Sequence, residues 1–392
     1  MTFEELKAMD ETYVMHTYGR FPVDIDHGEG ATLYSLSGRK YIDFTSGIGV
    51  NSLGYANPQW IAAITAQIAK LGHISNLFYT QPGALLAREL CTRSGMSKVF
   101  FGNSGAESNE AMIKVARKYS FDKYGKGRST ILTLNRSFHG RTITTLTATG
   151  QDSYHNYFFP FNEAFRYADP TLESIQAQAG DDVCGVMVEL IQGEGGLNPL
   201  DKAMVQGLAD LCKEKDWLLL VDEVQTGIGR TGSLFAFQQF GIQPDVVSFA
   251  KGIAGGLPLG GILTNEKCAT VLTPGTHGST FGANPVSTAA GLAVLETIDQ
   301  DFLTQVQEKG AYLREGIRAL GCPQLGEIVG MGLMLGIDVK GGRTNKELAA
   351  LLIDNGLLCL TAGSRLRLLP PLVITKDEID QGLAIMKQTL AG

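Results

Sequence analysis

The sequence predicts an α/β protein whose large domain is built on a mostly parallel, doubly wound sheet. From about Ser97 to Thr264, short apolar runs alternate with segments of helical periodicity. Runs that are apolar at every position indicate strands buried on both faces, and helices are the usual connection between parallel strands. The expected strands are Lys98–Phe101, Thr130–Leu134, Val183–Leu190, Trp217–Val221, Val246–Ala250 and Gly261–Leu263.

The two ends of the chain predict a smaller α+β domain. We expect an amphipathic helix from about Phe3 to Met15, and the alternating stretch Pro22–Phe44 predicts a small antiparallel hairpin region. At the other end of the chain, long helices are expected from Asn284-Pro285 to about Leu320, followed by strands near Leu333–Val339 and Arg365–Leu369. We therefore assign residues 1–48 and 284–392 to the small domain and residues 49–283 to the large one.

Composition and charge exclude several classes of partner. Of the 392 residues, 44% are hydrophobic and 19% charged, which is typical of a packed globular protein. The formal net charge is −7 and no basic arm is present, so we expect neither a nucleic-acid nor a membrane partner. The six cysteines are far apart and form no CxxC pair, so we expect reduced thiols, no metal site and a cytoplasmic protein.

Two of the expected strands end in side chains that carry charge. The run Trp217–Val221 leads into Asp222-Glu223, and the run that starts at Val246 leads into Lys251-Gly252. Ligands of open α/β sheets bind beyond the carboxyl ends of the strands. Either charge alone can simply mark the return of the chain to water, but together they predict an acid and an amine facing one crevice.

A third element, Asn103-Ser-Gly-Ala-Glu107, predicts an anion site. It follows the strand that starts at Lys98 and precedes an apolar-periodic helix, and Ser104 and Glu107 have the spacing of a capping box. Gly105 and Ala106 leave room for a phosphate on the exposed N–H groups of the first helical turn. A plain helix cap is the alternative interpretation.

Lysine, carboxylate and phosphate site together predict pyridoxal phosphate as the cofactor. Lys251 would form the Schiff base and move the proton, and Asp222 would keep the pyridine nitrogen protonated so that the ring can accept carbanion electrons. The glycines between Gly252 and Gly261 do not fit a dinucleotide-binding GxGxxG, and the P-loop, HExxH and GxSxG motifs do not occur.

At these residues the sequence resembles the class III (ω-amine) aminotransferases, and among them most closely the members that act on acetylornithine. The likeness covers nearly the whole chain. It rests on motifs that occur in the same order, namely Tyr18-Gly-Arg-Phe-Pro22, Asp43-Phe44 to Asn57-Pro58, Asn103 to Glu110, Ser137-Phe-His-Gly-Arg141, Glu189 to Gly196, Asp222-Glu-Val-Gln225, Arg230-Thr-Gly232, Ser248-Phe-Ala-Lys251, His277-Gly-Ser-Thr280, Asn284-Pro285 and Arg367 to Pro370.

The resemblance implies a fold-type I homodimer with active sites shared between subunits. It assigns Lys251 and Asp222 as catalytic residues. The implied cofactor site comprises Ser104, Gly105 and Ala106 at the phosphate, joined by Thr280 of the other subunit, Phe138 on the ring face, and the segment Asp222-Glu223-Val224-Gln225, in which Gln225 contacts the phenolic oxygen. Many members have Thr where this chain has Ala106, so backbone N–H groups must replace one hydroxyl contact.

The resemblance also implies the substrates, N2-acetylornithine and 2-oxoglutarate, the latter converted to glutamate, in arginine biosynthesis. Arg141, with Ser279 nearby, would bind the α-carboxylate of acetylornithine, and Arg367 that of glutamate. As a hypothesis, Glu194 pairs with Arg367 while acetylornithine is bound and swings away for glutamate, with freedom supplied by Gly193, Gly195 and Gly196. We treat His139 and His277 as structural.

Alternative functions remain open. Ornithine δ-aminotransferases resemble this chain but usually carry Tyr where Ile48 stands, and succinylornithine and 4-aminobutyrate transaminases are further alternatives. A non-catalytic regulator would need a DNA-binding extension, for which the first 25 residues leave no space before the strands begin. An isomerase would need no external 2-oxoglutarate, whereas two arginines favour two carboxylate substrates.

Overall fold

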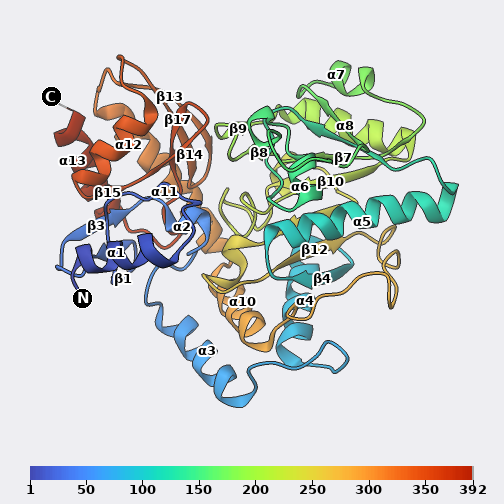
Figure 1. Ribbon diagram of the computed structural model, residues 1–392, viewed down its shortest axis with the longest axis horizontal. Helices are drawn as coiled ribbons and strands as arrows, with labels where there is room; N and C mark the ends of the chain where they lie inside the picture. The colour runs from blue at the N-terminus through green and yellow to red at the C-terminus, as the bar shows by residue number, and fades with distance from the viewer. Residues whose placement is uncertain (391–392) are drawn as a thin grey trace.

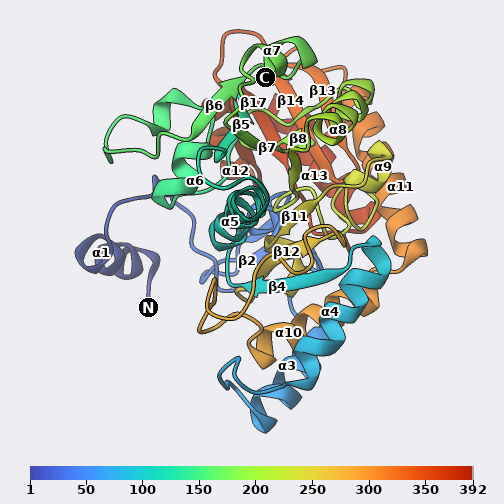
Figure 2. The same ribbon diagram turned by 90° about the vertical axis from the view of Figure 1, so that its right-hand side faces the viewer.

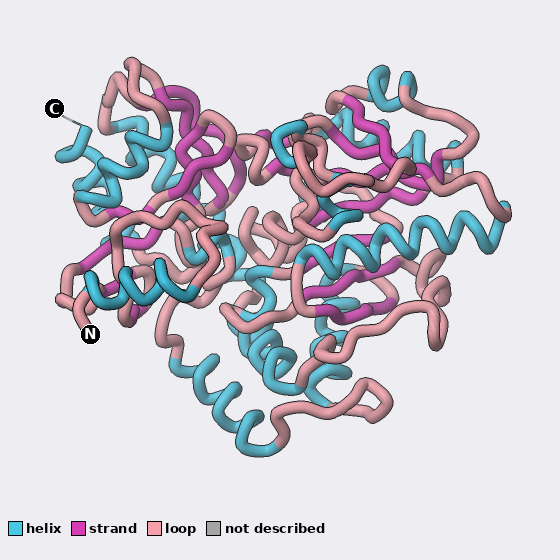
Figure 3. Tube along the Cα trace, viewed as in Figure 1, coloured by secondary structure: helices cyan, strands magenta, loops and turns pink. Residues whose placement is uncertain are grey.

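The computed structural model describes residues 1–390, and a seven-stranded sheet forms the centre of its larger half (Figures 1 and 3). Across the sheet the strand order is β4-β12-β11-β10-β7-β5-β6. The pairs from β11 to β6 are all parallel, and β12 runs antiparallel to β11 and β4. The prediction of a mostly parallel sheet is confirmed. The strands are β4 (Lys98–Gly102), β5 (Thr130–Leu134), β6 (Phe165–Ala168), β7 (Val183–Val188), β10 (Leu218–Asp222), β11 (Val246–Phe249) and β12 (Gly260–Thr264).

Alternate residues of the central strands face two separate apolar layers. Leu219 of β10 belongs to the layer that contains Leu208 of α8 (Lys202–Lys215). Its neighbour Leu220 belongs to the other layer, with Met112 of α5 (Gly105–Tyr124), the helix seen nearly end-on in Figure 2. Helices therefore cover both faces of the sheet, which explains why the strands are apolar at every position.

The smaller half of the molecule is built from both ends of the chain. One sheet has the order β1-β2-β3-β15, in which β15 (Leu357–Leu358) pairs in parallel with β3 (Lys40–Asp43). A second, antiparallel sheet has the order β13-β14-β17-β16. The remaining strands of the two sheets are β1 (His27–Glu29), β2 (Thr32–Tyr34), β13 (Leu325–Met331), β14 (Met334–Val339), β16 (Leu360–Ala362) and β17 (Arg365–Leu368).

Helices complete both halves. Helix α10 packs against α3 and α4, on the larger half of the molecule. The domain boundaries after residues 48 and 283 stay a prediction, and residues 391 and 392 of the last segment lie outside the described chain. Over residues 1–390, none of the helices combines the length and apolar composition that crossing a membrane requires. The other helices are α1 (Phe3–Tyr13), α2 (Ser46–Gly49), α3 (Pro58–Lys70), α4 (Gln81–Ser94), α6 (Ile143–Ala148), α7 (Leu172–Ala177), α9 (Phe237–Phe240), α10 (Pro285–Thr297), α11 (Gln300–Ala319), α12 (Asn345–Asp354) and α13 (Lys376–Leu390).

One carboxylate joins the two terminal segments of the smaller half. Glu378, in the first turn of α13, accepts hydrogen bonds at Oε2 from the backbone N–H and the hydroxyl of Thr375, both at 2.9 Å. At Oε1 it accepts from the backbone N–H of Ala31 at 2.9 Å and from the hydroxyl of Thr32 at 3.4 Å. The same side chain therefore caps α13 and ties it to β2.

We expect Glu378→Ala to lower the free energy of unfolding by roughly 1–3 kcal/mol, because it leaves two backbone N–H groups without their acceptor. Urea unfolding followed by circular dichroism measures the loss. Asp377→Ala is the matched control and should cost roughly 0.5 kcal/mol, since within residues 1–390 the side chain of this exposed neighbour bonds only Gln381. Equal effects of the two substitutions would contradict the role of Glu378.

Candidate active site

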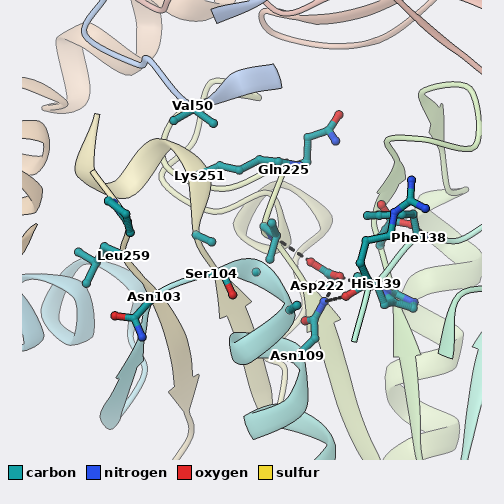
Figure 4. A pocket seen from close by; sticks show the side chains of 18 of the residues that line it. Val50, Asn103, Ser104, Asn109, Phe138, His139, Asp222, Gln225, Lys251 and Leu259 are labelled. Carbon is teal, nitrogen blue, oxygen red and sulfur yellow. Dashed lines mark hydrogen bonds and ion pairs between the residues drawn. The ribbon is translucent and has the colours of Figure 1, made fainter. Parts of the chain in front are cut away.

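A cavity of about 480 Å³ lies at the carboxyl ends of β4, β10 and β11 (Figure 4). The segments that directly follow these strands supply much of its lining, as expected for an open α/β sheet. Loops that lead to α6 and β12 close the remaining sides. The lining residues are Val50, Asn103, Ser104, Gly105, Ala106, Asn109, Phe138, His139, Gly140, Arg141, Glu189, Asp222, Val224, Gln225, Ala250, Lys251, Gly256, Leu257, Pro258 and Leu259.

Lys251 stands where β11 ends, in a turn of 3₁₀ helix, Lys251–Ala254. Its backbone has a φ of 46°, a left-handed conformation that is uncommon outside glycine and is often found at functional sites. Burial lowers the pKa of the Lys251 amine. Among the nearby charges, Glu194 raises this pKa, Arg367 lowers it and Asp222 raises it, in decreasing order of effect. A lowered amine pKa increases the share of the neutral, nucleophilic form.

Asp222, at the end of β10, is 4% exposed and accepts four hydrogen bonds. Oδ2 accepts from Nδ2 of Asn109 at 2.7 Å and lies 2.8 Å from Nδ1 of His139. Oδ1 accepts from the backbone N–H of Val224 at 3.0 Å and from the hydroxyl of Ser248 at 3.3 Å. These contacts hold the carboxylate in one orientation.

Asn109 and His139 are site residues that the sequence analysis missed. Asn109 also donates from Nδ2 to the backbone oxygen of His139 at 2.7 Å, so the three side chains form one buried network (Figure 4). Two signals were available. Asn109 stands one helical turn after Gly105, and His139 directly follows Phe138. Our treatment of His139 as merely structural was incomplete, because its ring contacts Asp222.

The first turn of α5 lies at the cavity, where the sequence predicts an anion site. Ser104 is the N-cap, and its hydroxyl accepts from the backbone N–H of Glu107 at 3.2 Å. Gly105 is required by packing, since a Cβ there would lie 2.7 Å from the side chain of Val224. The first N–H groups of the helix and its dipole favour an anion in the cavity. Ser104, Gly105 and Ala106 all line it.

The predicted ring-contacting residues Phe138, Val224 and Gln225 also line the cavity. Gln225 packs so closely on Gly193 that a Cβ at that glycine would lie 2.6 Å from its amide group. Glu223 differs from the other predicted cofactor residues, because its carboxylate points away from the cavity. It accepts from the backbone N–H groups of Ala236 and Phe237 and from the hydroxyl of Thr226, and burial raises its pKa to about 7.

Glu189 is a further lining residue to which the sequence analysis assigned no role. Its carboxylate accepts from the backbone N–H of Phe138 at 2.8 Å and from that of Gly193 at 3.2 Å. Burial, followed by the charge of Asp222, raises the pKa of Glu189 well above its ordinary value. It joins the loop that carries Phe138 to the loop that carries Glu194.

The predicted substrate residues occupy two places. Arg367 of β17 is 4% exposed and forms an ion pair with Glu194, and both charges act on Lys251. Arg141 lines the cavity itself, whereas Arg367 and Glu194 are not among its lining residues. The hydroxyl of Ser279 accepts from Nδ2 of Asn103 at 3.1 Å, which places it next to the segment that follows β4.

Thr280 is exposed in the single chain, and its predicted contact with the phosphate of a second subunit stays a prediction.

The arrangement as a whole brings together an amine, a buried carboxylate, the start of a helix and an aromatic ring at one cavity. These groups fit a flat, phosphorylated aromatic aldehyde of the kind that the sequence predicts. Lys251 would bond such an aldehyde, Asp222 would pair with its ring nitrogen and the first turn of α5 would hold its phosphate.

The comparisons with known proteins agree with this chemistry. Residues 13–390 match the family described as Aminotransferase class-III. A curated relative, the acetylornithine aminotransferase of Haemophilus ducreyi, is 49% identical over 393 residues, which cover all of both chains.

Solved structures of similar proteins share the fold along the whole chain. The ornithine aminotransferase of Toxoplasma gondii, described with PLP at its active site, has a TM-score of 0.94 and 30% identity and covers 99% of this chain and 94% of its own. The acetylornithine aminotransferase of Elizabethkingia anophelis has a TM-score of 0.88 and 29% identity, covering 100% of this chain and 99% of its own. From the family match and the full-length relative, we conclude that this chain belongs to the class-III aminotransferases.

Proposed function

We propose that this protein transfers the δ-amino group of N2-acetylornithine to 2-oxoglutarate, giving N-acetylglutamate 5-semialdehyde and glutamate, as in arginine biosynthesis. The observation that carries the proposal is the placement of two arginines around Lys251. Arg141 lines the same cavity as Lys251, and Arg367, paired to Glu194, is close enough for its charge to act on Lys251. A full-length relative that is 49% identical bears the name of this activity.

Pyridoxal phosphate is the cofactor of class-III aminotransferases, and when bound it supplies a ring that accepts the electrons of a deprotonated substrate carbon. Lys251 is the residue that would hold it and carry a proton to and from the substrate carbon. Asp222, fixed by four hydrogen bonds, would hold a proton on the ring nitrogen. Phe138 and Val224 would flank the ring, and the first turn of α5 would bind the phosphate.

The ion pair between Glu194 and Arg367 would adapt one site to two unlike substrates. Glutamate carries an α-carboxylate beside the reacting carbon, whereas acetylornithine carries only CH₂ there. A buried guanidinium with no partner is costly, so Glu194 neutralises Arg367 when acetylornithine is bound. When glutamate binds, its carboxylate takes the place of Glu194.

The movement that we propose is one of the Glu194 side chain. A Cβ at Gly193 would lie 2.6 Å from Gln225, and one at Gly195 would lie 2.2 Å from the backbone oxygen of Arg136. These glycines therefore allow close packing on both sides of Glu194. Because this packing constrains the backbone at Gly193 and Gly195, the switch that we propose relies on rotation of the Glu194 side chain. It does not rely on the backbone freedom that we expected from these two glycines.

We further propose that the active enzyme is a cytoplasmic homodimer. Large apolar side chains are exposed in the single chain near Thr280, which we expect to contact the second cofactor site. Phe281 is 60% exposed, Leu77 87% and Phe78 63%. Leu77 and Phe78 lie close to Phe281, because the neighbouring Asn76 donates hydrogen bonds to the backbone oxygens of Ser279 and Gly282. Helix α1 buries none of its residues and stands apart from the body (Figure 2). A second copy would cover such surfaces.

The assignment of Lys251 predicts the position of a covalent label. Borohydride reduction of the yellow holoenzyme should attach the pyridoxyl group to Lys251, as read by peptide mapping, and Lys251→Ala should lower turnover by at least roughly 10²–10⁴-fold. A label on Lys114 or Lys267 would show that another lysine holds the cofactor.

The role of Glu194 predicts opposite changes in the two half-reactions. In Glu194→Ala, single-turnover rates should rise for glutamate and fall for acetylornithine, each by the equivalent of roughly 1–3 kcal/mol, because Arg367 is left open. Glu194→Gln, which keeps the shape and removes the charge, should shift both rates in the same directions. If the two half-reactions fall together, Glu194 has only a structural role.

The proposed donor is tested by a substrate panel with 2-oxoglutarate as acceptor. Acetylornithine should exceed ornithine in kcat/KM, because Ile48, two residues before the cavity residue Val50, offers no polar group to a second ammonium. Succinylornithine and 4-aminobutyrate complete the panel, with glutamate formation as the readout. A kcat/KM for ornithine equal to or above that for acetylornithine would favour an ornithine δ-aminotransferase instead.

A further inference from the structure

Two aromatic rings lie against the guanidinium of Arg141. Its Cζ lies 4.4 Å from the ring centroid of Tyr154 and 5.6 Å from that of Phe138. The side chain of Arg141 lines the cavity and is exposed. Within residues 1–390 it takes part in none of the ion pairs. Cation–π contacts are therefore what orients this side chain.

Tyr154 packs against the loop that carries Phe138, the aromatic residue that lines the cavity. It is half-buried in the 3₁₀ turn Asp152–Tyr154, and its ring packs edge-on against Phe138, with centroids 5.6 Å apart and planes at 62°. The turn is held in place by Gln151, whose Nε2 donates to the backbone oxygen of Ser137 at 2.9 Å. Arg141, Tyr154 and Phe138 therefore form one packed unit.

A ring face holds a guanidinium without using its N–H donors. An acidic partner would instead occupy the fork of donors that binds a carboxylate in bidentate geometry. The contact with Tyr154 thus restricts the orientation of Arg141 and leaves its fork available to a ligand. We propose that Tyr154 is a positioning residue for substrate recognition, which orients Arg141 toward the carboxylate of the amino donor.

This inference rests on the proposed function, since it takes the ligand of Arg141 to be a substrate carboxylate. Two donors separate this role from a general structural one. Acetylornithine has the carboxylate, and N-acetylputrescine is the same molecule without it. In the holoenzyme, Tyr154→Leu should raise KM for acetylornithine about three- to tenfold and leave KM for N-acetylputrescine unchanged. Tyr154→Phe keeps the ring and should behave as the unsubstituted enzyme does.

Binding without turnover gives a second readout. N-acetylnorvaline has the carboxylate and acetamide of acetylornithine but no transferable amine, and calorimetric titration should show the same three- to tenfold weaker binding to Tyr154→Leu. Tyr154→Gln serves as a second non-aromatic variant should the leucine variant melt early. An equal rise in KM for both donors, or no rise for acetylornithine, would overturn the proposal.

Arg141→Met separates this inference from the function on which it rests. If Arg141→Met weakens binding of N-acetylnorvaline and Tyr154→Leu does not, Tyr154 has no positioning role and the proposed function stands. If Arg141→Met leaves that binding unchanged, Arg141 does not bind the donor carboxylate, and both the assigned role of Arg141 and the inference about Tyr154 are wrong. A selective loss in both variants, with Tyr154→Phe unaffected, supports the inference.

Discussion

The parallel pairing of β10 with β11 is the constraint on which the rest of the site depends. Its register places Asp222 opposite Ser248, three residues before Lys251, so that the acid and the amine leave the sheet at the same edge. The hydroxyl of Ser248 donates to Asp222 across this pair. Backbone hydrogen bonds of a buried sheet thus set the spacing of the two backbone positions.

Burial of several charged groups around Lys251 is tolerated because acids and cations lie close together. The acids Glu189, Asp222 and Glu194 and the cations Lys251 and Arg367 act on one another within the same region. Isolated burial of any one of them would cost several kcal/mol, by the order of magnitude known for unpaired ions. In the switch that we propose, exchange of Glu194 for a substrate carboxylate would keep this charge balance.

The ion pair of Arg367 and Glu194, which we propose as part of the substrate site, joins the two halves of the molecule. Arg367 lies on β17 of the smaller half, and Glu194 lies in the loop after β8 (Ile191–Gln192). Two strand residues before Arg367, Arg365 donates from Nη1 to the backbone oxygen of Gly196 at 2.6 Å. The same loop is therefore tied to the smaller half at Gly196 and to Glu189 at Gly193. A change in how the halves meet would therefore alter the pair of Arg367 and Glu194.

The sequence by itself determined the alternation of buried strands and helices, the strand ends that carry Asp222 and Lys251, and the capped start of α5, because periodicity and capping are local properties. It did not indicate β6, whose residues Phe165–Ala168 include Arg and Tyr at the sheet edge, because an edge strand need not be apolar throughout. Only the tertiary structure decided that Asn109 and His139 bind Asp222, that Glu223 points away from the cavity and that Tyr154 covers Arg141. Such contacts join residues that are distant in sequence, and side-chain direction there is set by packing, which no local pattern records.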